Sequence, residues 1–118
     1  MTVMEIKDSN ITIMVKDMDK SIAFYQSIGF LIKQRWQNYY AQLVASGITI
    51  GLHPANESNS TNNSGNISIG FSTENFDITK KGLEQLNINF TAREEEGGQF
   101  LHFADPDGTS LYFIKSKW

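Results

Sequence analysis

Few residues of this 118-residue chain have side chains that could carry chemistry. Cysteine does not occur, which excludes disulfides, thiolate nucleophiles and all-cysteine metal sites. Histidine occurs twice, as His53 and His102. The one run of carboxylates directly precedes Gly97 and Gly98, where we expect a solvated hairpin tip. Nucleophile-elbow, P-loop and dinucleotide-binding glycine motifs do not occur in the sequence. The sequence therefore gives no sign of the enzyme classes that these motifs mark.

Composition and charge narrow the class of protein. Hydrophobic residues make up 40% of the chain and charged residues 19%, enough for one compact domain with an apolar core. The net charge of −3 gives no electrostatic reason to expect a nucleic acid or an anionic membrane as partner. No apolar run approaches the roughly 18 residues of a membrane span. Charged residues at Glu5, Lys7 and Asp8 argue against a secretory leader, and we expect a cytoplasmic protein.

The elements that must position any site are arranged as an imperfect repeat. Asn10-Ile11-Thr12-Ile13 matches Asn66-Ile67-Ser68-Ile69, an offset of 66 − 10 = 56, and the run from Gly47 matches the run from Gly108, an offset of 108 − 47 = 61. Small polar residues fill the stretch between the two copies. We therefore predict one domain over residues 1–118, with module one at about 8–54, an Asn/Ser-rich linker at 55–65, and module two at about 66–116.

We predict that each module consists of a strand, a helix and three further strands. Ile11, Ile13 and Val15 alternate with polar residues, the period of a half-buried strand. Asp17 or Asp19 is expected to cap the following helix, and Gly29 to end it. The further strands of module one are predicted at 30–37, 39–45 and 48–53. In module two, we predict a strand at 67–71, a helix opening at Asn75 or Asp77, and strands at 89–94, 99–104 and 109–116.

Two motifs of the chain resemble a known superfamily. Ile13-Met14-Val15-Lys16-Asp17-Met18, followed by Ser21-Ile22-Ala23-Phe24-Tyr25 and Ile28-Gly29-Phe30, resembles the strand-Asp-helix opening of the vicinal oxygen chelate superfamily. Asp105-Pro106-Asp107-Gly108 resembles its turn before the last strand. This superfamily contains glyoxalase I, bleomycin resistance proteins, fosfomycin resistance enzymes and extradiol dioxygenases. The resemblance spans about residues 10–114 and implies an α+β fold in which two βαβββ modules form a curled mixed sheet with a concave cleft.

The resemblance also identifies four positions at which catalytic members hold a divalent metal. In this chain those positions are Asn10, Gly51, Asn66 and Tyr112. None of them offers a carboxylate or an imidazole, the groups that such a cation prefers. We therefore expect neither a metal nor another cofactor, and catalytic residues remain unassigned. The alternative is a divalent metal such as Zn, Ni, Fe or Mn held by substitute ligands, for which His53 and His102 are weak candidates.

Strand alternation then selects a set of ligand-binding candidates. The apolar residues of the first strand of each module should pack under the helices, and their neighbours along the strand should face the cleft. Arg35 and Trp36 are adjacent in one predicted strand, so the sequence leaves open which of them faces the cleft. The candidate ligand-binding residues are Asn10, Thr12, Asn66, Ser68, Ser110, Tyr112, Arg35, Trp36 and His102.

Three functions are compatible with these residues. The first is a metal-free protein that binds a small molecule, a drug or a metabolite, as the bleomycin resistance branch does. The second is a metal-dependent lyase, dioxygenase or transferase of the same superfamily with substitute ligands. The third is a non-catalytic module that binds a protein partner. The resemblance further implies a homodimer.

Overall fold

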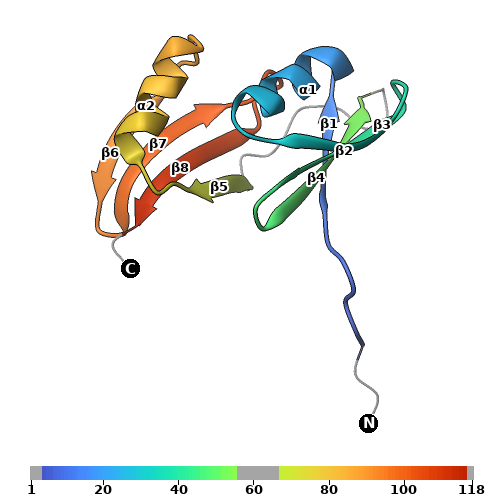
Figure 1. The fold of residues 1–118 in the computed structure, drawn as a ribbon, viewed down its shortest axis with the longest axis horizontal. Helices are drawn as coiled ribbons and strands as arrows, with labels where there is room; N and C mark the ends of the chain where they lie inside the picture. Colours follow the sequence, from blue (N-terminus) through green and yellow to red (C-terminus); the bar gives the residue numbers. More distant parts are fainter. Residues whose placement is uncertain (1–3, 56–66, 117–118) are drawn as a thin grey trace. The chain divides into compact units, whose positions relative to one another are not determined.

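The computed structural model describes residues 4–55 and 67–116 (Figure 1). The chain divides into two compact units, Met1–Thr61 and Asn62–Trp118, and this division falls within the predicted linker 55–65. Apart from Ala55 that linker lies outside the described residues, and so does the candidate Asn66.

The first unit contains one helix and a four-stranded mixed sheet. Strand β1 pairs in parallel with β4, and the strand order is β1-β4-β3-β2 with antiparallel pairing elsewhere. Its elements are β1 (Ile11–Val15), α1 (Met18–Ser27), β2 (Leu31–Trp36), β3 (Tyr40–Ala45) and β4 (Ile48–Pro54).

The second unit repeats this topology. Strand β5 pairs in parallel with β8, and the strand order is β5-β8-β7-β6. Its elements are β5 (Ser68–Ser72), α2 (Phe76–Gln85), β6 (Thr91–Glu95), β7 (Gly98–Ala104) and β8 (Ser110–Ser116). The predicted α+β fold with two βαβββ modules is confirmed, and the described strands form one four-stranded sheet in each unit.

The core of each unit lies between its helix and one face of its sheet. Helix α1 contacts β2, β3 and β4, while α2 contacts β8 (Figure 1). Alternate strand residues on these faces are apolar and have lost nearly all contact with solvent, which is the main stabilising term of such a layer. The fully buried members are Ala41, Leu43, Ile50 and Leu52 in the first unit and Leu101 and Leu111 in the second, each 0% exposed.

The helix ends match between the units and define the repeat. The side chain of Asp17 accepts a hydrogen bond from the backbone N–H of Lys20, and that of Asn75 accepts one from Ile78, each at 3.0 Å. Both helices are followed by a residue with positive φ, Gly29 at 118° and Asn87 at 58°. The two capping residues are 58 positions apart (75 − 17), and so are the two residues with positive φ (87 − 29).

This spacing corrects the expected equivalence of Asn10 and Asn66. Strand register agrees with the helix ends, because Thr12 lies opposite Gly51 in the first sheet and Gly70 lies opposite Tyr112 in the second. The matching Asn-Ile pairs, 56 positions apart, are therefore two residues out of step with the structural repeat. The structural counterpart of Asn10 is Ser68, at 10 + 58.

The turn before β8 is held by a buried carboxylate. Asp105 is 6% exposed, and its Oδ1 accepts hydrogen bonds from the backbone N–H groups of Asp107 at 2.9 Å and Thr109 at 2.8 Å. Gly108 supplies the φ of 89° that the turn requires. The motif thus has a structural role, since it aims β8 back along the sheet.

Replacement of the α2 cap measures how much local capping stabilises this fold. Asn75→Ala removes the acceptor for the Ile78 N–H, and we expect the free energy of unfolding to fall by about 1 kcal/mol. Urea denaturation of the full chain measures the change. Glu84→Ala, on an exposed position of the same helix, is the control and should change stability by less than about 0.5 kcal/mol. Equal effects of the two substitutions would contradict this account of the cap.

Candidate functional site

Each sheet has one face that does not carry its helix, and these helix-free faces hold most of the predicted site residues. Each face is built within its own unit. On the first, the strand residues that alternate with the core include Thr12, Gly51, Gln42 and Gln34, which lie opposite one another across the four strands. At these four positions polar or small residues stand where the face under the helix has apolar ones.

A tyrosine ring lies over Gly51 in the first sheet. A Cβ placed at Gly51 would overlap the hydroxyl and ring carbons of Tyr40 on β3, so glycine is what leaves room for the ring. The Tyr40 hydroxyl accepts a hydrogen bond from Asn10 Nδ2 at 3.1 Å and a longer one from Gln42 Nε2 at 3.5 Å. Asn10, the residue before β1, is thereby tied to β3 across the intervening strand β4.

Trp36 extends this tyrosine into an aromatic surface. The Trp36 and Tyr40 rings stack with centroids 5.6 Å apart and planes inclined by 26°. Trp36 nevertheless remains 48% exposed. We call Trp36 and Tyr40 the aromatic platform; it offers a flat apolar area beside the amide groups of Asn10 and Gln42.

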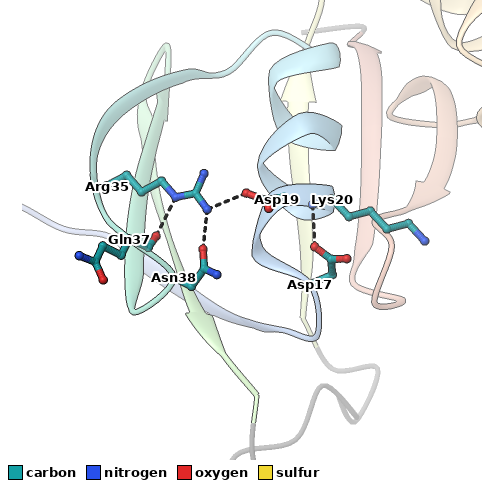
Figure 2. A network of polar contacts seen from close by, with 6 residues as sticks. All are labelled: Asp17, Asp19, Lys20, Arg35, Gln37 and Asn38. Carbon is teal, nitrogen blue, oxygen red and sulfur yellow. Dashed lines mark hydrogen bonds and ion pairs between the residues drawn. The ribbon is translucent and has the colours of Figure 1, made fainter.

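Arg35 lies on the opposite side of the strand from Trp36, which answers the question left open by the sequence. Its guanidinium forms an ion pair with Asp19 of α1 at 2.7 Å and hydrogen bonds to the β2–β3 turn (Figure 2). In the strand register it lies opposite the buried Ala41. The structure therefore does not bring Arg35 together with the other candidates of this sheet.

A second glycine–tyrosine contact lies on the helix-free face of the second sheet. Tyr112 on β8 lies opposite Gly70 on β5, and a Cβ at Gly70 would overlap the Tyr112 ring. Tyr112 is flanked by His102, with ring centroids 5.7 Å apart, and by Phe100, at 5.8 Å. His102 and Phe100 stack on each other at 5.6 Å with planes inclined by 13°. Phe100, His102 and Tyr112 thus form a three-ring aromatic cluster.

Two hydroxyl groups lie at one end of this cluster's sheet. Ser68 and Ser110 are directly opposite across β5 and β8, and their Oγ atoms are 2.9 Å apart, so either one can donate the hydrogen bond between them. Ser68 Oγ also reaches the Ser110 carbonyl at 3.4 Å. Of the predicted polar candidates in module two, Ser68, Ser110, Tyr112 and His102 are therefore brought to one face.

His53 lies on the helix-free face of the first sheet, opposite Met14. Its Nδ1 is 2.9 Å from the carbonyl oxygen of Pro54. Because a carbonyl only accepts, Nδ1 carries the proton and donates in this contact. His53 is half-buried and belongs to a different unit from His102.

The residues at the positions that the resemblance assigns to a divalent metal do not fit such a cation. Gly51 has no side chain, and the space above it is filled by Tyr40. Asn10 uses its amide nitrogen to hold Tyr40, and Ser68, the structural counterpart of Asn10, is paired with Ser110. A neutral hydroxyl or amide oxygen is a weak ligand without carboxylates beside it. Within residues 4–55 and 67–116, no three histidine, aspartate or glutamate side chains gather as a metal-binding group.

Sequence reasoning missed the aromatic cluster member Phe100 and the amide of Gln42. Both lie two residues from another site residue on the same strand, Phe100 from His102 and Gln42 from Tyr40. The period of two along a strand could have found them once one neighbour was chosen. The role of Gly70 carried no comparable signal, because the ring above it comes from another strand.

Comparison with known proteins agrees with this architecture. The sequence profile of the Glyoxalase/Bleomycin resistance protein/Dioxygenase superfamily matches residues 9–113. The chain belongs to this superfamily. The resemblance deduced from the two motifs is thereby confirmed over nearly the whole chain.

Solved structures of this superfamily share the fold at low sequence identity. A fosfomycin resistance protein from Listeria monocytogenes is 20% identical, with a TM-score of 0.78 over 94% of this chain and 93% of that chain. A bleomycin-binding protein in complex with bleomycin is 18% identical, with a TM-score of 0.70 over 95% of this chain and 100% of that chain. A lactoylglutathione lyase from Agrobacterium tumefaciens is 17% identical, with a TM-score of 0.73 over 92% of each chain.

Neither α1 nor α2 has the length and apolar character needed to cross a bilayer.

Substitution of Gly70 tests the glycine–tyrosine contact. Gly70→Ala forces the Tyr112 ring to move away from His102 and Phe100, and we expect the free energy of unfolding to fall by about 0.5–1.5 kcal/mol, the value of an aromatic ring contact. Chemical denaturation measures it, and Gly70→Ala combined with Tyr112→Ala should show a favourable coupling that offsets part of the loss.

Gly82 provides the matched glycine control. A Cβ at Gly82, inside α2, would meet nothing within 4 Å. Gly82→Ala should therefore stabilise the protein by about 0.5–1 kcal/mol through helix propensity. A loss of stability at Gly82, or an unchanged stability for Gly70→Ala, would contradict the packing described.

Proposed function

We propose that this protein is a metal-free binding protein for a small molecule, a drug or a metabolite, that carries a planar aromatic or heteroaromatic group. The observation that carries the proposal is the aromatic platform, in which Trp36 stacks on Tyr40 while 48% of its surface stays exposed. A second flat ring placed on Trp36 would extend the existing stack and remove apolar area from water.

The polar groups beside the platform can fix the orientation of a bound ligand. Asn10 and Gln42 both contact the Tyr40 hydroxyl, and Thr12 is an exposed hydroxyl opposite Gly51. Neutral amides and hydroxyls of this kind can hydrogen-bond the edge of a heteroaromatic ring, while the ring's face meets Trp36. This combination of an apolar surface with a few polar groups is typical of small-molecule sites.

The helix-free face of the second unit supports the same chemistry. Its cluster of Phe100, His102 and Tyr112 adds aromatic area, and the Ser68–Ser110 pair adds a hydroxyl donor and acceptor. The similar structure of a bleomycin-binding protein in complex with bleomycin is a precedent for ligand capture by this fold. The donor sets of both faces favour binding over the metal-dependent lyase, dioxygenase or transferase activity of other members.

Two substitutions test the binding function. In a thermal-shift screen of planar heteroaromatic compounds, with bleomycin among them, a ligand at 100 times its Kd should stabilise the protein by roughly 2.7 kcal/mol. Trp36→Leu should weaken a hit by about threefold to tenfold, the loss of one ring contact. On the helix-free face of the second unit, Tyr112→Phe should weaken a ligand bound to that face by about 1 kcal/mol if the phenol donates to the ligand.

Tyr39→Phe is the matched control for the second substitution. Tyr39 lies in the β2–β3 turn and is 73% exposed, so loss of its hydroxyl should leave affinity unchanged. Calorimetric titration of each variant gives the affinities. About one equivalent of Ni, Fe, Mn or Zn bound to protein purified without chelator would overturn the metal-free proposal and favour a metal-dependent enzyme. A screen without hits would instead favour a module that binds a protein partner.

We also propose that the protein acts as a homodimer in the cytoplasm. Large apolar side chains that a second copy could cover are exposed on the first unit, among them Leu31 at 71%. Sedimentation equilibrium should give twice the chain mass of 13.3 kDa. Replacement of Leu31 by Lys should shift that equilibrium toward the monomer, and a monomer at every concentration of the unmodified chain would refute the proposal.

A further inference from the structure

Arg35 lies beside the aromatic platform in the sequence but on the other side of the strand, and its contacts suggest what it does there. Its Nε donates to the carbonyl of Gln37 at 2.7 Å, and its Nη2 donates to Asn38 Oδ1 at 2.6 Å and Asp19 Oδ1 at 2.7 Å (Figure 2). One guanidinium thus joins the β2–β3 turn to the first turn of α1. We call these four residues the Arg35 network.

The turn that Arg35 holds has an unfavourable backbone conformation. Gln37 has a φ of 48°, in the left-handed region where residues with a Cβ pay a steric penalty. Glycine or asparagine would be the usual choice at such a position, and glutamine has no local hydrogen-bonding advantage there. The strain must therefore be offset by other contacts, and the two Arg35 hydrogen bonds fall on Gln37 and on the residue after it.

The same turn sets the direction in which Trp36 leaves the strand. Trp36 is the last residue of β2 and lies opposite Tyr40, and its carbonyl accepts from the backbone N–H of Tyr39 at 2.9 Å. A change of backbone conformation at Gln37 would break this closure and alter the register of Trp36 against Tyr40. The stack of the two rings consequently depends on the conformation of the turn.

We propose that Arg35 is a positioning residue: it holds Gln37 in its left-handed conformation and thereby keeps Trp36 stacked on Tyr40. This inference deepens the proposed function, since Trp36 belongs to the surface on which we place the ligand. The ion pair with Asp19 contributes less to this positioning than the two hydrogen bonds to the turn. The side chains are 31% exposed for Arg35 and 78% exposed for Asp19, so solvent screens their attraction.

A direct role in binding is the competing explanation for any loss of affinity. A pocket of about 230 Å³ is lined by Asp19 and Asn38 of the Arg35 network together with Asp17 and Pro54, among others. A ligand group seated there would lie near Arg35. The test therefore has to separate the position of Trp36 from contact between Arg35 and the ligand.

Trp36 fluorescence provides a readout that does not depend on any ligand. The chain has two tryptophans, so Trp118→Phe leaves Trp36 as the single emitter. In that background, Arg35→Gln should increase acrylamide quenching of Trp36 and reduce its near-ultraviolet circular dichroism. If the ordered turn is then populated about one tenth of the time, the affinity for a hit from the heteroaromatic screen falls about tenfold. Arg35→Lys, which keeps the charge, should show a smaller change in the same direction and serves if Arg35→Gln does not fold.

Rescue at Gln37 separates the two explanations. Gln37→Gly added to Arg35→Gln should restore both the Trp36 spectrum and the affinity, because glycine adopts positive φ without the Cβ penalty. Gln37→Ala in the same background keeps the Cβ and should restore neither. Asp19→Asn alone should change the affinity by less than about twofold, as expected for an exposed ion pair.

The Trp36 spectra decide the proposal whether or not a ligand is found. An unchanged Trp36 spectrum in folded Arg35→Gln overturns the positioning role, and so does a failure of Gln37→Gly to restore the spectrum. A loss of affinity with an unchanged spectrum assigns Arg35 to direct ligand contact and also overturns it. If the unmodified protein binds nothing in the screen, the proposed function fails, while the spectra still test the role of Arg35.

Discussion

A phenol ring can lie flat on a β-sheet only where the residue beneath it has no side chain. Both helix-free faces of this protein depend on that constraint, at Gly51 under Tyr40 and at Gly70 under Tyr112. The aromatic surfaces follow from it, because Trp36 stacks on one tyrosine, and His102 and Phe100 lie beside the other. The polar contacts follow as well, since Asn10 reaches the Tyr40 hydroxyl only while that ring stays low on the sheet.

The two units satisfy the constraint with different strands. In the first sheet the ring comes from β3 and the glycine from β4, whereas in the second the ring comes from β8 and the glycine from β5. The repeat with an offset of 58 at the helices therefore preserves the backbone while the side chains of the two faces have diverged. Gln42 and His102 occupy matching positions, opposite Gly51 and Tyr112 respectively, yet one contacts a phenol and the other stacks between rings.

Most of the backbone was predictable from the sequence because its signals are local. Asp17 and Asn75, each one of two predicted caps, cap the helices. Strand alternation identified the buried Ile13 and Val15 of β1, but Ile11, which was expected to pack under the helix, is 40% exposed because it lies at the end of its strand. Alternation also placed His102 on the other face of its strand from Leu101 and Phe103. The offset of Asn66 from Asn10 was misjudged because a short match of apolar residues outweighed the helix caps. The choice between Arg35 and Trp36 could not be made from sequence, since it depends on the irregular β2–β3 pairing between Ile32 and Gln34 and on Asp19, sixteen residues away. The overlap of a ring with a glycine on a neighbouring strand is likewise a tertiary property.

The filling of the space above Gly51 also constrains how this protein can evolve. An acidic or imidazole side chain at that position would collide with the Tyr40 ring where it now lies. Such a change requires the Tyr40 ring to move away or to be replaced, and either would remove the partner of both Trp36 and Asn10. A side chain at position 51 would therefore be gained only with the loss of the aromatic platform. A larger residue at position 51 and the present place of the Tyr40 ring thus exclude each other.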